Sequence, residues 1–172
     1  MKPSDARVLW FTGLSGAGKS TLAGLVYQEL KARNLPVERL DGDEIRNLFP
    51  QTGFSREDRD LHVKRVGYLS SLLQRNGVWV VVSLISPYRE ARDFVREHCA
   101  RFTEIYVSTE LAECERRDVK GLYAKARRGE IAQFTGVSDP YEPPVRPELD
   151  IDTGKLSVAE AARKILEYLE RE

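Results

Sequence analysis

A glycine-rich run that directly follows an apolar segment constrains the fold of this chain more than any other feature. Residues 8–11 are apolar, and residues 13–20 follow the pattern Gly-x-x-x-x-Gly-Lys-Ser. Between a strand and a helix, such a run leaves backbone N–H groups pointing into one concavity at the helix N-terminus, where phosphate groups bind. A chance glycine-rich turn would lack the flanking strand and helix. The sequence therefore predicts a site for ATP or GTP.

The residues of this loop have separate expected roles. Lys19 places a positive charge near the β and γ phosphates, and Ser20 offers its hydroxyl to Mg²⁺. The residues expected to bind ATP are those of the loop and of the first helical turn: Gly13, Leu14, Ser15, Gly16, Ala17, Gly18, Lys19, Ser20 and Thr21.

The composition is that of one globular domain over residues 1–172. Hydrophobic residues make up 41% of the chain and the formal net charge is zero, so the overall charge indicates neither a nucleic acid nor an anionic membrane as partner. Residues 1–5 lack the apolar core of a leader, and no segment approaches the ~18 apolar residues of a membrane span. Cys99 and Cys114 lack CxxC spacing and are expected to be reduced structural thiols. We therefore expect a cytoplasmic protein.

Apolar segments typical of strands alternate with segments of helical period along the chain, which predicts a parallel sheet covered by helices. We expect the α/β fold of P-loop NTPases, with about five strands between helices and a mobile lid. Residues 78–82 show no alternation at all, which is typical of a central strand. The expected strands are residues 8–11, 37–40, 78–82, 102–107 and 149–151. The expected helices are residues 21–33, 55–76, 88–99 and the segment after residue 157.

Residues 116–147 lack a strong apolar period and are rich in charge, glycine and proline. In their first part a single acid, Asp118, stands among cations. These cations are Arg116, Arg117, Lys120, Lys125, Arg127 and Arg128. A solvated helix face is the usual explanation of such a run. Next to a triphosphate site, a mobile lid that neutralises charge and excludes water is the better interpretation.

Mg²⁺ at a phosphate loop usually needs a nearby carboxylate. The expected central strand, residues 78–82, is followed by serines rather than by an acid. Asp41 and Asp43, after the second expected strand, are therefore the candidate metal ligands together with Ser20. Either acid could also orient or deprotonate an acceptor hydroxyl. Asp41 has a second explanation, because an aspartate before a helix is often only its N-cap.

Three arginines lie between the second and third expected strands, where an acceptor would dock: Arg46, Arg59 and Arg65. Arginine pairs bidentately with phosphate and sulfate oxygens, which indicates an acceptor that carries such a group, although Arg65 also fits an exposed helix position. The sequence contains no NKxD element of the kind with which GTPases read guanine, and a motor or helicase would need a longer chain. The sequence therefore favours a small kinase that acts on a metabolite.

The order and spacing of these motifs resemble those of the adenylylsulfate kinase family over almost the whole chain. The residues that carry the resemblance are 13–21, 40–43, 45–46, 53–55, 57–59, 65–67, 83, 85–89, 114–115, 117–118, 120–123, 125–127, 129–131, 134–136 and 140–142. The resemblance implies ATP-dependent phosphorylation of the 3'-hydroxyl of adenosine 5'-phosphosulfate, which gives 3'-phosphoadenosine 5'-phosphosulfate and ADP.

The resemblance also implies roles for single residues. Arg46 and Arg59 would hold the phosphosulfate, and Phe54 and Phe134 would sandwich the adenine of the acceptor. Arg117 would stack on the ATP base. The complete acceptor set that it implies is Asp43, Arg46, Phe54, Arg59, His62, Ile85, Ser86, Lys120, Leu122, Lys125 and Phe134.

Catalytic roles are expected for Lys19, Asp41, Asp43 and Ser86. Ser86 matches a serine that has been considered a phosphoryl carrier in the family. Direct in-line transfer is favoured, because a loose phosphoryl transition state needs positioning more than a covalent relay.

Residues on the acceptor side depart from the family pattern. His62 stands where the family usually has Asn, Lys64 replaces Arg, Glu44 replaces Asn, and residues 47–53 are one residue short. These departures bear on acceptor affinity rather than on the reaction class. Two other functions stay open: a kinase for another anionic metabolite, and a non-catalytic nucleotide-binding partner subunit. The sequence also leaves open a homodimer and functional coupling to an ATP sulfurylase.

Overall fold

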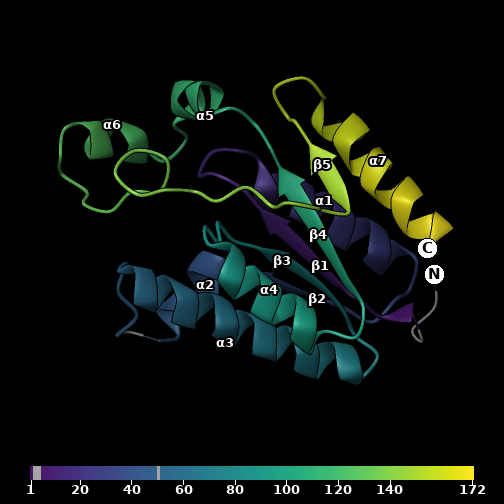
Figure 1. Cartoon of the computed structure of the whole chain (residues 1–172). Helices are drawn as coiled ribbons and strands as arrows, with labels where there is room; N and C mark the ends of the chain where they lie inside the picture. Colours follow the sequence, from purple (N-terminus) through teal and green to yellow (C-terminus); the bar gives the residue numbers. More distant parts are fainter. Residues whose placement is uncertain (2–4, 50) are drawn as a thin grey trace.

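Five parallel strands form one sheet at the centre of the molecule (Figure 1). The computed structural model describes residues 1, 5–49 and 51–172. Within this part of the chain the strands are β1 (Val8–Thr12), β2 (Val37–Asp41), β3 (Trp79–Ser83), β4 (Phe102–Val107) and β5 (Leu149–Ile151). Their order is β2-β3-β1-β4-β5, and each neighbouring pair is parallel. The predicted α/β fold is confirmed, as are the predicted strands, apart from small shifts at their ends.

Helices cover both faces of the sheet. α3 and α4 lie on one face and α1 and α7 on the other, whereas α5 and α6 lie beyond the carboxyl ends of the strands (Figure 1). The bounds are α1 (Lys19–Ala32), α2 (Gly42–Asn47), α3 (Arg56–Arg75), α4 (Arg89–His98), α5 (Leu111–Arg117), α6 (Leu122–Arg127) and α7 (Val158–Arg171). The short helices α2, α5 and α6 were not expected from the sequence, because segments of six or seven residues show no clear helical period.

The sheet separates two hydrophobic cores. Leu9 and Phe11 of β1 belong to the core that α1 and α7 cover, and Val8 and Trp10 belong to the core that α3 and α4 cover. Every residue of β1 is buried. Burial of a large apolar side chain contributes about 1.5–3 kcal/mol, so both faces of β1 fix the strand, and its end is a rigid support for the loop that follows.

β1 and β3 are neighbouring interior strands of the sheet. Residues 78–82 were predicted to form a central strand, and this is confirmed: β3 lies between β2 and β1, and all of its residues are buried. Any strand with a neighbour on each side and helices on both faces has the same continuous apolar pattern. In the observed order Asp41 of β2 pairs in register with Ser83 of β3. Ser83 in turn pairs with Phe11 of β1, so the ends of β2 and β1 lie at the same edge of the sheet.

Side chains cap the helices at the helix ends that the sequence predicts, residues 55, 76 and 157. At the start of α3 the Ser55 hydroxyl accepts a hydrogen bond from the backbone N–H of Asp58. Ser157 and Glu160 form a reciprocal capping box at the start of α7, and Asn76 is the C-cap of α3. Each N-cap contributes about 1 kcal/mol, and together they fix where the helices begin.

The predicted lid, residues 116–147, contains the end of α5, all of α6 and an irregular return segment. Three of its residues, Tyr123, Ala126 and Phe134, are buried and belong to the core that α1 and α7 cover. The lid segment therefore has an apolar inner side as well as a charged outer one, which its weak apolar period did not indicate.

Among the described residues, no helix is both long and apolar enough to cross a lipid bilayer. The expected absence of a leader concerns residues 1–5, and residues 2–4 lie outside the described residues. Residue 50, within the segment 47–53 that departs from the family pattern, also lies outside the described residues.

Candidate active site

The phosphate loop, residues 13–20, joins β1 to α1 in a conformation that requires glycine. Gly13, Gly16 and Gly18 have φ angles of 146°, 75° and 97°, which L-residues with side chains rarely adopt. A Cβ on Gly13 would lie 2.4 Å from the carbonyl oxygen of Val107. Gly18 is the N-cap of α1 and has no side chain to cap it, so the first N–H groups of α1 can bind an anion.

Lys19 turns back from the start of α1 towards this loop. Only 8% of its surface is exposed, and its Nζ donates to the Leu14 carbonyl oxygen at 2.7 Å. Burial lowers the pKa of Lys19 to about 8, although the nearby carboxylates act in the opposite direction. A buried ammonium is stabilised by an anionic partner, so a phosphate group in the loop would restore the full charge of Lys19.

Asp41, at the end of β2, has two functions in the structure. Its Oδ1 accepts from the backbone N–H of Asp43 at 2.9 Å and so caps α2. Its Oδ2 accepts from the hydroxyls of Ser20 at 3.3 Å and Ser83 at 3.1 Å. The capping explanation of Asp41 is thus confirmed, and the same carboxylate also reaches the phosphate loop.

Ser20 and Asp41 offer hard oxygen atoms of the kind that Mg²⁺ prefers. Both residues line one cavity. Among the described residues, no group of three or more His, Cys, Asp or Glu side chains is arranged to hold a metal ion. The two oxygen donors of Ser20 and Asp41 fit a cation that takes few protein ligands and completes its coordination with water and phosphate oxygens, as Mg²⁺ does.

Asp43 and Lys120 meet across this cavity. The Nζ of Lys120, in the lid segment, lies 2.6 Å from the Oδ2 of Asp43, and this hydrogen bond raises the pKa of Lys120. Both side chains are well exposed, at 63% and 73%. Exposed pairs contribute only about 0.2–1 kcal/mol, so substrate groups can replace either partner at low cost.

The cavity has a volume of about 350 Å³ and collects most of the predicted site residues between the ends of β2 and β3, the phosphate loop and the lid segment. The predicted residues that line it are Ser15, Gly16, Gly18, Lys19, Ser20, Thr21, Asp41, Asp43, Arg46, Phe54, Arg59, His62, Ile85, Ser86, Lys120, Leu122 and Phe134. The predicted residues outside its lining are Gly13, Leu14, Ala17, Arg117 and Lys125.

Arg59 connects the two predicted aromatic residues. Its Nε donates to the carbonyl oxygen of Phe54 at 2.8 Å. Its other two nitrogens donate to the Gln133 carbonyl oxygen and the Thr135 hydroxyl, on either side of Phe134. The side chain is nearly buried. In this structure the guanidinium is thus directed at the backbone that carries both phenylalanines, a role that the sequence did not indicate.

Arg46, from α2, lies beside the exposed ring of Phe54. Its guanidinium carbon is 4.7 Å from the ring centroid, and its Nη1 donates to the Gly53 carbonyl oxygen at 2.6 Å. Burial, with the charge of Arg59 nearby, lowers the pKa of Arg46. A buried guanidinium with a second positive charge nearby is stabilised by an anion beside it.

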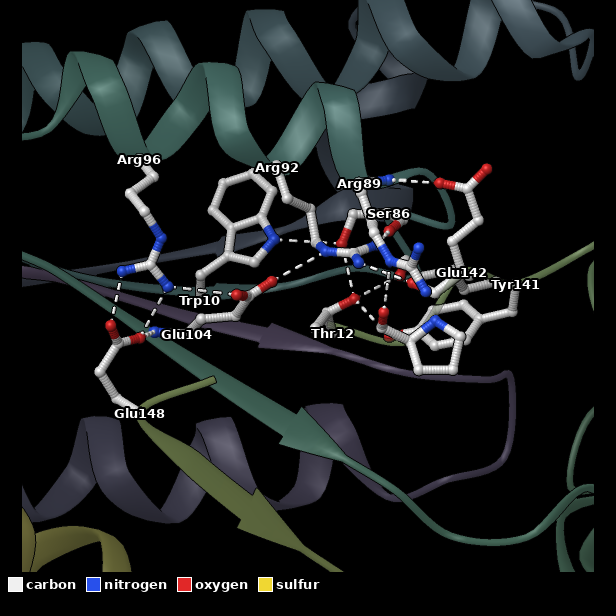
Figure 2. A network of polar contacts seen from close by, with 12 residues as sticks. Trp10, Thr12, Ser86, Arg89, Arg92, Arg96, Glu104, Tyr141, Glu142 and Glu148 are labelled. Carbon is white, nitrogen blue, oxygen red and sulfur yellow. Dashed lines mark hydrogen bonds and ion pairs between the residues drawn. The ribbon is translucent and has the colours of Figure 1, made fainter. Parts of the chain in front are cut away.

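Ser86 lines the cavity, but its hydroxyl is engaged inside the protein (Figure 2). Its Oγ accepts from Trp10 Nε1 at 3.1 Å and donates to Thr12 Oγ1 at 2.9 Å. Ser86 is 1% exposed and has a φ of 41°, a left-handed conformation that is strained for a residue with a side chain.

His62, from α3, is buried against the backbone of α2. Its Nε2 lies 3.0 Å from the Gly42 carbonyl oxygen. Burial, followed by the charge of Arg46, lowers the pKa of His62 to about 4, so the ring is neutral near pH 7. A neutral ring next to a carbonyl oxygen carries its proton on Nε2 and donates it there.

Arg117 lies beside the phosphate loop rather than in the cavity. Its Nη1 and Nη2 donate to the hydroxyl and the carbonyl oxygen of Thr153 at 2.8 and 2.9 Å. The hydroxyl of Thr153 donates in turn to the Ala17 carbonyl oxygen in the phosphate loop at 2.8 Å. Lys125 is exposed on α6. Both residues flank the cavity without lining it.

Tyr123 is a site residue that the sequence analysis missed as such. It is 3% exposed, lines the cavity, and its hydroxyl donates to the Ser15 carbonyl oxygen at 2.9 Å. Its ring meets Phe134 edge to face, with centroids 5.0 Å apart. An aromatic residue within a charged segment was the available signal, and it indicates where that segment touches the core.

Comparisons with known proteins agree with this geometry. The model of the family described as adenylylsulphate kinase matches residues 5–152. The chain belongs to the adenylylsulphate kinase family. The adenylyl-sulfate kinase of Halothermothrix orenii is 51% identical over 171 residues, which is 99% of this chain and 92% of that protein.

A solved structure and a longer relative extend the comparison. The structure of the Mycobacterium tuberculosis APS kinase CysC in complex with AMPPNP and APS has a TM-score of 0.92 and 41% identity, and covers 96% of this chain and 98% of that chain. A probable bifunctional SAT/APS kinase 2 of Sorangium cellulosum is 51% identical over 164 residues, or 95% of this chain and 28% of that protein. The predicted family and its activity, phosphorylation of adenylyl sulfate by ATP, are thus confirmed.

The lowered pKa of Lys19 predicts that nucleotide binding takes up a proton near pH 8. Phosphates raise this pKa, so the affinity for ATP falls as pH rises above about 8, by up to about tenfold per pH unit. Calorimetry between pH 7.5 and 9.5, in buffers of different ionisation enthalpy, measures both the proton uptake and the affinity for ATP. Lys19→Arg, which stays charged over this range, is the control and should take up no proton. A wild-type affinity that is constant to pH 9.5 would contradict the assignment.

His62 predicts a loss of stability in mild acid. Its folded-state pKa lies below the unfolded value of 6.5, so the unfolded chain binds the proton first, and the native state loses stability as pH falls from 6.5 towards 4. We expect this contribution to be about 2 kcal/mol and absent in His62→Asn. Urea unfolding of both proteins at pH 7.5, 5.5 and 4.5 measures it, and identical pH dependence in the two would rule it out.

Proposed function

We propose that the cavity transfers the γ-phosphoryl group of ATP directly to the 3'-hydroxyl of adenosine 5'-phosphosulfate. The observation that carries the proposal is that Lys19 of the phosphate loop and Asp43 of α2 line the same cavity. A bond forms between the 3'-oxygen and the γ-phosphorus, and the bond from that phosphorus to the β–γ bridging oxygen breaks. The hydroxyl proton passes to Asp43, and ADP leaves.

On the donor side, the phosphates of ATP occupy the phosphate loop, and Lys19 supplies positive charge to them. Ser20 and Asp41 would hold Mg²⁺, with Asp43 as a further candidate ligand. Bound Mg²⁺ neutralises part of the charge that develops on the phosphates. The AMPPNP complex of the Mycobacterium tuberculosis relative supports ATP as the nucleotide.

On the acceptor side, the adenine stacks between Phe54 and Phe134. Phe54 is 60% exposed at the edge of the cavity, whereas Phe134 is buried against Tyr123, so one ring is free to close on a base and the other is fixed. Arg46 binds the phosphosulfate, because bidentate pairing suits its oxygens. Arg59 acts on the acceptor through the backbone of both phenylalanines.

The lid segment closes over the bound substrates, with Leu122 on its inner side and Lys125 and Arg117 flanking the cavity. Closure excludes water from the transfer. Lys120, which pairs with Asp43 in this structure, exchanges that carboxylate for substrate oxygens. The exchange leaves Asp43 free to orient the acceptor hydroxyl.

Direct transfer is supported by the hydrogen bonds of Ser86. A serine that carries the phosphoryl group would have to release its proton and turn its Oγ towards the γ-phosphate. Here the Oγ of Ser86 is held by Trp10 and Thr12 in a buried position. Breaking two buried hydrogen bonds costs more than positioning the acceptor directly.

The proposal extends to partners and location. A relative that joins SAT and APS kinase on one chain supports functional coupling of this chain to an ATP sulfurylase. Two buried free cysteines, Cys99 and Cys114, support a reducing compartment such as the cytoplasm. A homodimer remains a further proposal for this chain.

Asp43→Asn should keep ATP binding but lower kcat by about 10²–10⁴, because the side chain loses the charge that orients or deprotonates the acceptor hydroxyl. Incubation with ATP, Mg²⁺ and adenosine 5'-phosphosulfate, with mass analysis for the gained phosphate, measures turnover. Glu44→Gln is the matched control: its carboxylate lies one residue further along α2, faces Arg39, and should have little effect. If the kcat of Asp43→Asn stays near the wild-type value, the catalytic role falls to Asp41. If the wild type transfers no phosphate, the proposed reaction is wrong.

Arg46→Ala and Arg59→Ala should both raise the acceptor KM more than the ATP KM, but for different reasons. Loss of a charge-assisted contact costs about 1.5–3 kcal/mol, or roughly ten- to a hundredfold. Arg46→Ala should reduce the preference for adenosine 5'-phosphosulfate over adenosine, whereas Arg59→Ala should weaken both acceptors equally through the phenylalanines. Steady-state kinetics with the two acceptors separate these effects, and the reverse pattern would assign the phosphosulfate to Arg59.

A further inference from the structure

A buried cluster of charges contacts Ser86 of the cavity wall and consists of residues to which the reaction itself gives no role (Figure 2). Arg92 of α4 has a side chain that is 2% exposed, and its Nε donates to Glu104 Oε1 of β4 at 2.8 Å. Arg96 pairs with the same Glu104 and with Glu148. Buried ion pairs often add little stability relative to apolar residues of similar size, so stability alone does not account for Arg92.

The other two nitrogens of Arg92 bind two separate segments of the backbone. Its Nη1 donates to the Ser86 carbonyl oxygen at 2.5 Å, and its Nη2 donates to the Glu142 carbonyl oxygen at 2.6 Å. We call residues 84–88 the pocket loop and residues 140–143 the strap. One planar guanidinium therefore joins a buried strand, the pocket loop and the strap, with a separate nitrogen for each.

The pocket loop forms part of the cavity wall, and its conformation is strained. Ile85 and Ser86 line the cavity, and Ser86 has the left-handed φ of 41°. Such a conformation persists only where surrounding contacts determine it. The Thr12 hydroxyl donates to the Ile85 carbonyl oxygen at 2.7 Å, and Arg92 holds the next carbonyl along the loop, so the two residues fix the loop from opposite sides.

The strap is the segment by which the chain returns from the lid. It begins a few residues after Phe134 and is bonded to the pocket loop directly, since the Glu142 N–H donates to the Pro87 carbonyl oxygen at 2.8 Å. Tyr141 lies 2.9 Å from Thr12 Oγ1. Because the Thr12 proton is used on Ile85, the Tyr141 hydroxyl is the donor. The strap, the pocket loop and the end of β1 thus form one hydrogen-bonded unit around Arg92.

We propose that Arg92 is a positioning residue for the acceptor. It sets the pocket loop and the root of the lid segment at a fixed relative position, and hence the distance from the wall at Ile85 and Ser86 to the aromatic side chain of Phe134. The phosphate loop receives no contact from this guanidinium among those that the described residues show. This inference rests on the proposed acceptor side of the cavity.

The experiment compares Arg92→Lys with Arg96→Lys. Both keep the positive charge in the cluster, but a lysine at position 92 cannot hold three segments with one nitrogen. For Arg92→Lys we expect the KM for adenosine 5'-phosphosulfate to rise about tenfold or more, with the Kd for ATP within about twofold of wild type. Arg96→Lys, one turn along α4 and bonded only to Glu104 and Glu148 among the described residues, should change both constants less than about threefold.

Tyr141→Phe provides a second test if Arg92→Lys folds poorly, because it removes a single hydroxyl from the strap. We expect Tyr141→Phe to raise the acceptor KM and leave the ATP affinity unchanged, as Arg92→Lys does, but by a smaller factor. Thermal unfolding of each variant confirms that the kinetics are measured on folded protein. Equal losses of acceptor and ATP binding, or constants equal to wild type in both variants, would overturn the inference. A wild type without turnover would instead contradict the proposed function.

Discussion

The site depends on the burial of β1 between two hydrophobic cores. Alternate side chains of this strand enter opposite cores, so the strand cannot slide or turn without exposing apolar surface on one side. The phosphate loop begins at its end, where Gly13 passes within contact distance of the Val107 backbone. The neighbouring strands then bring Ser83 and Asp41 to the same edge of the sheet. The positions of the phosphate loop, Ser83 and Asp41 therefore depend on this one strand.

The acceptor side is built differently, from contacts between segments that lie far apart in the sequence. Arg59 of α3 donates to the Gln133 carbonyl oxygen and the Thr135 hydroxyl, on either side of Phe134, and Lys120 reaches Asp43. Here the position of each group depends on hydrogen bonds of single side chains rather than on the sheet. Rigid strands therefore position the proposed donor side of the cavity, and a set of separate polar contacts positions the proposed acceptor side.

This difference explains how much the sequence could predict. The strands, the phosphate loop and the helix caps have local patterns, and all were predicted nearly to the residue. The continuous apolar pattern of residues 78–82 correctly predicted an interior strand, but it could not give the strand order, because β1 and β3 have the same pattern. The contacts of Arg59 and Arg92 could not be predicted, because an arginine that binds a carbonyl more than 40 residues away leaves no local pattern. Asp41 was predicted both as a cap and as a site residue; the structure confirms the cap, and the same carboxylate also accepts a hydrogen bond from Ser20 of the phosphate loop.

The contact of Thr153 with Ala17 relates the site to the order in which the chain is synthesised. The phosphate loop belongs to the first twenty residues, yet its Ala17 carbonyl is bound by a threonine that follows the last strand. β1 likewise pairs only with strands that come much later in the chain. On the ribosome the loop is therefore made early and completed late, because its outer support emerges only after some nine-tenths of the chain has been translated. Before β3 and β4 are translated, the phosphate loop follows a strand whose partners are not yet made.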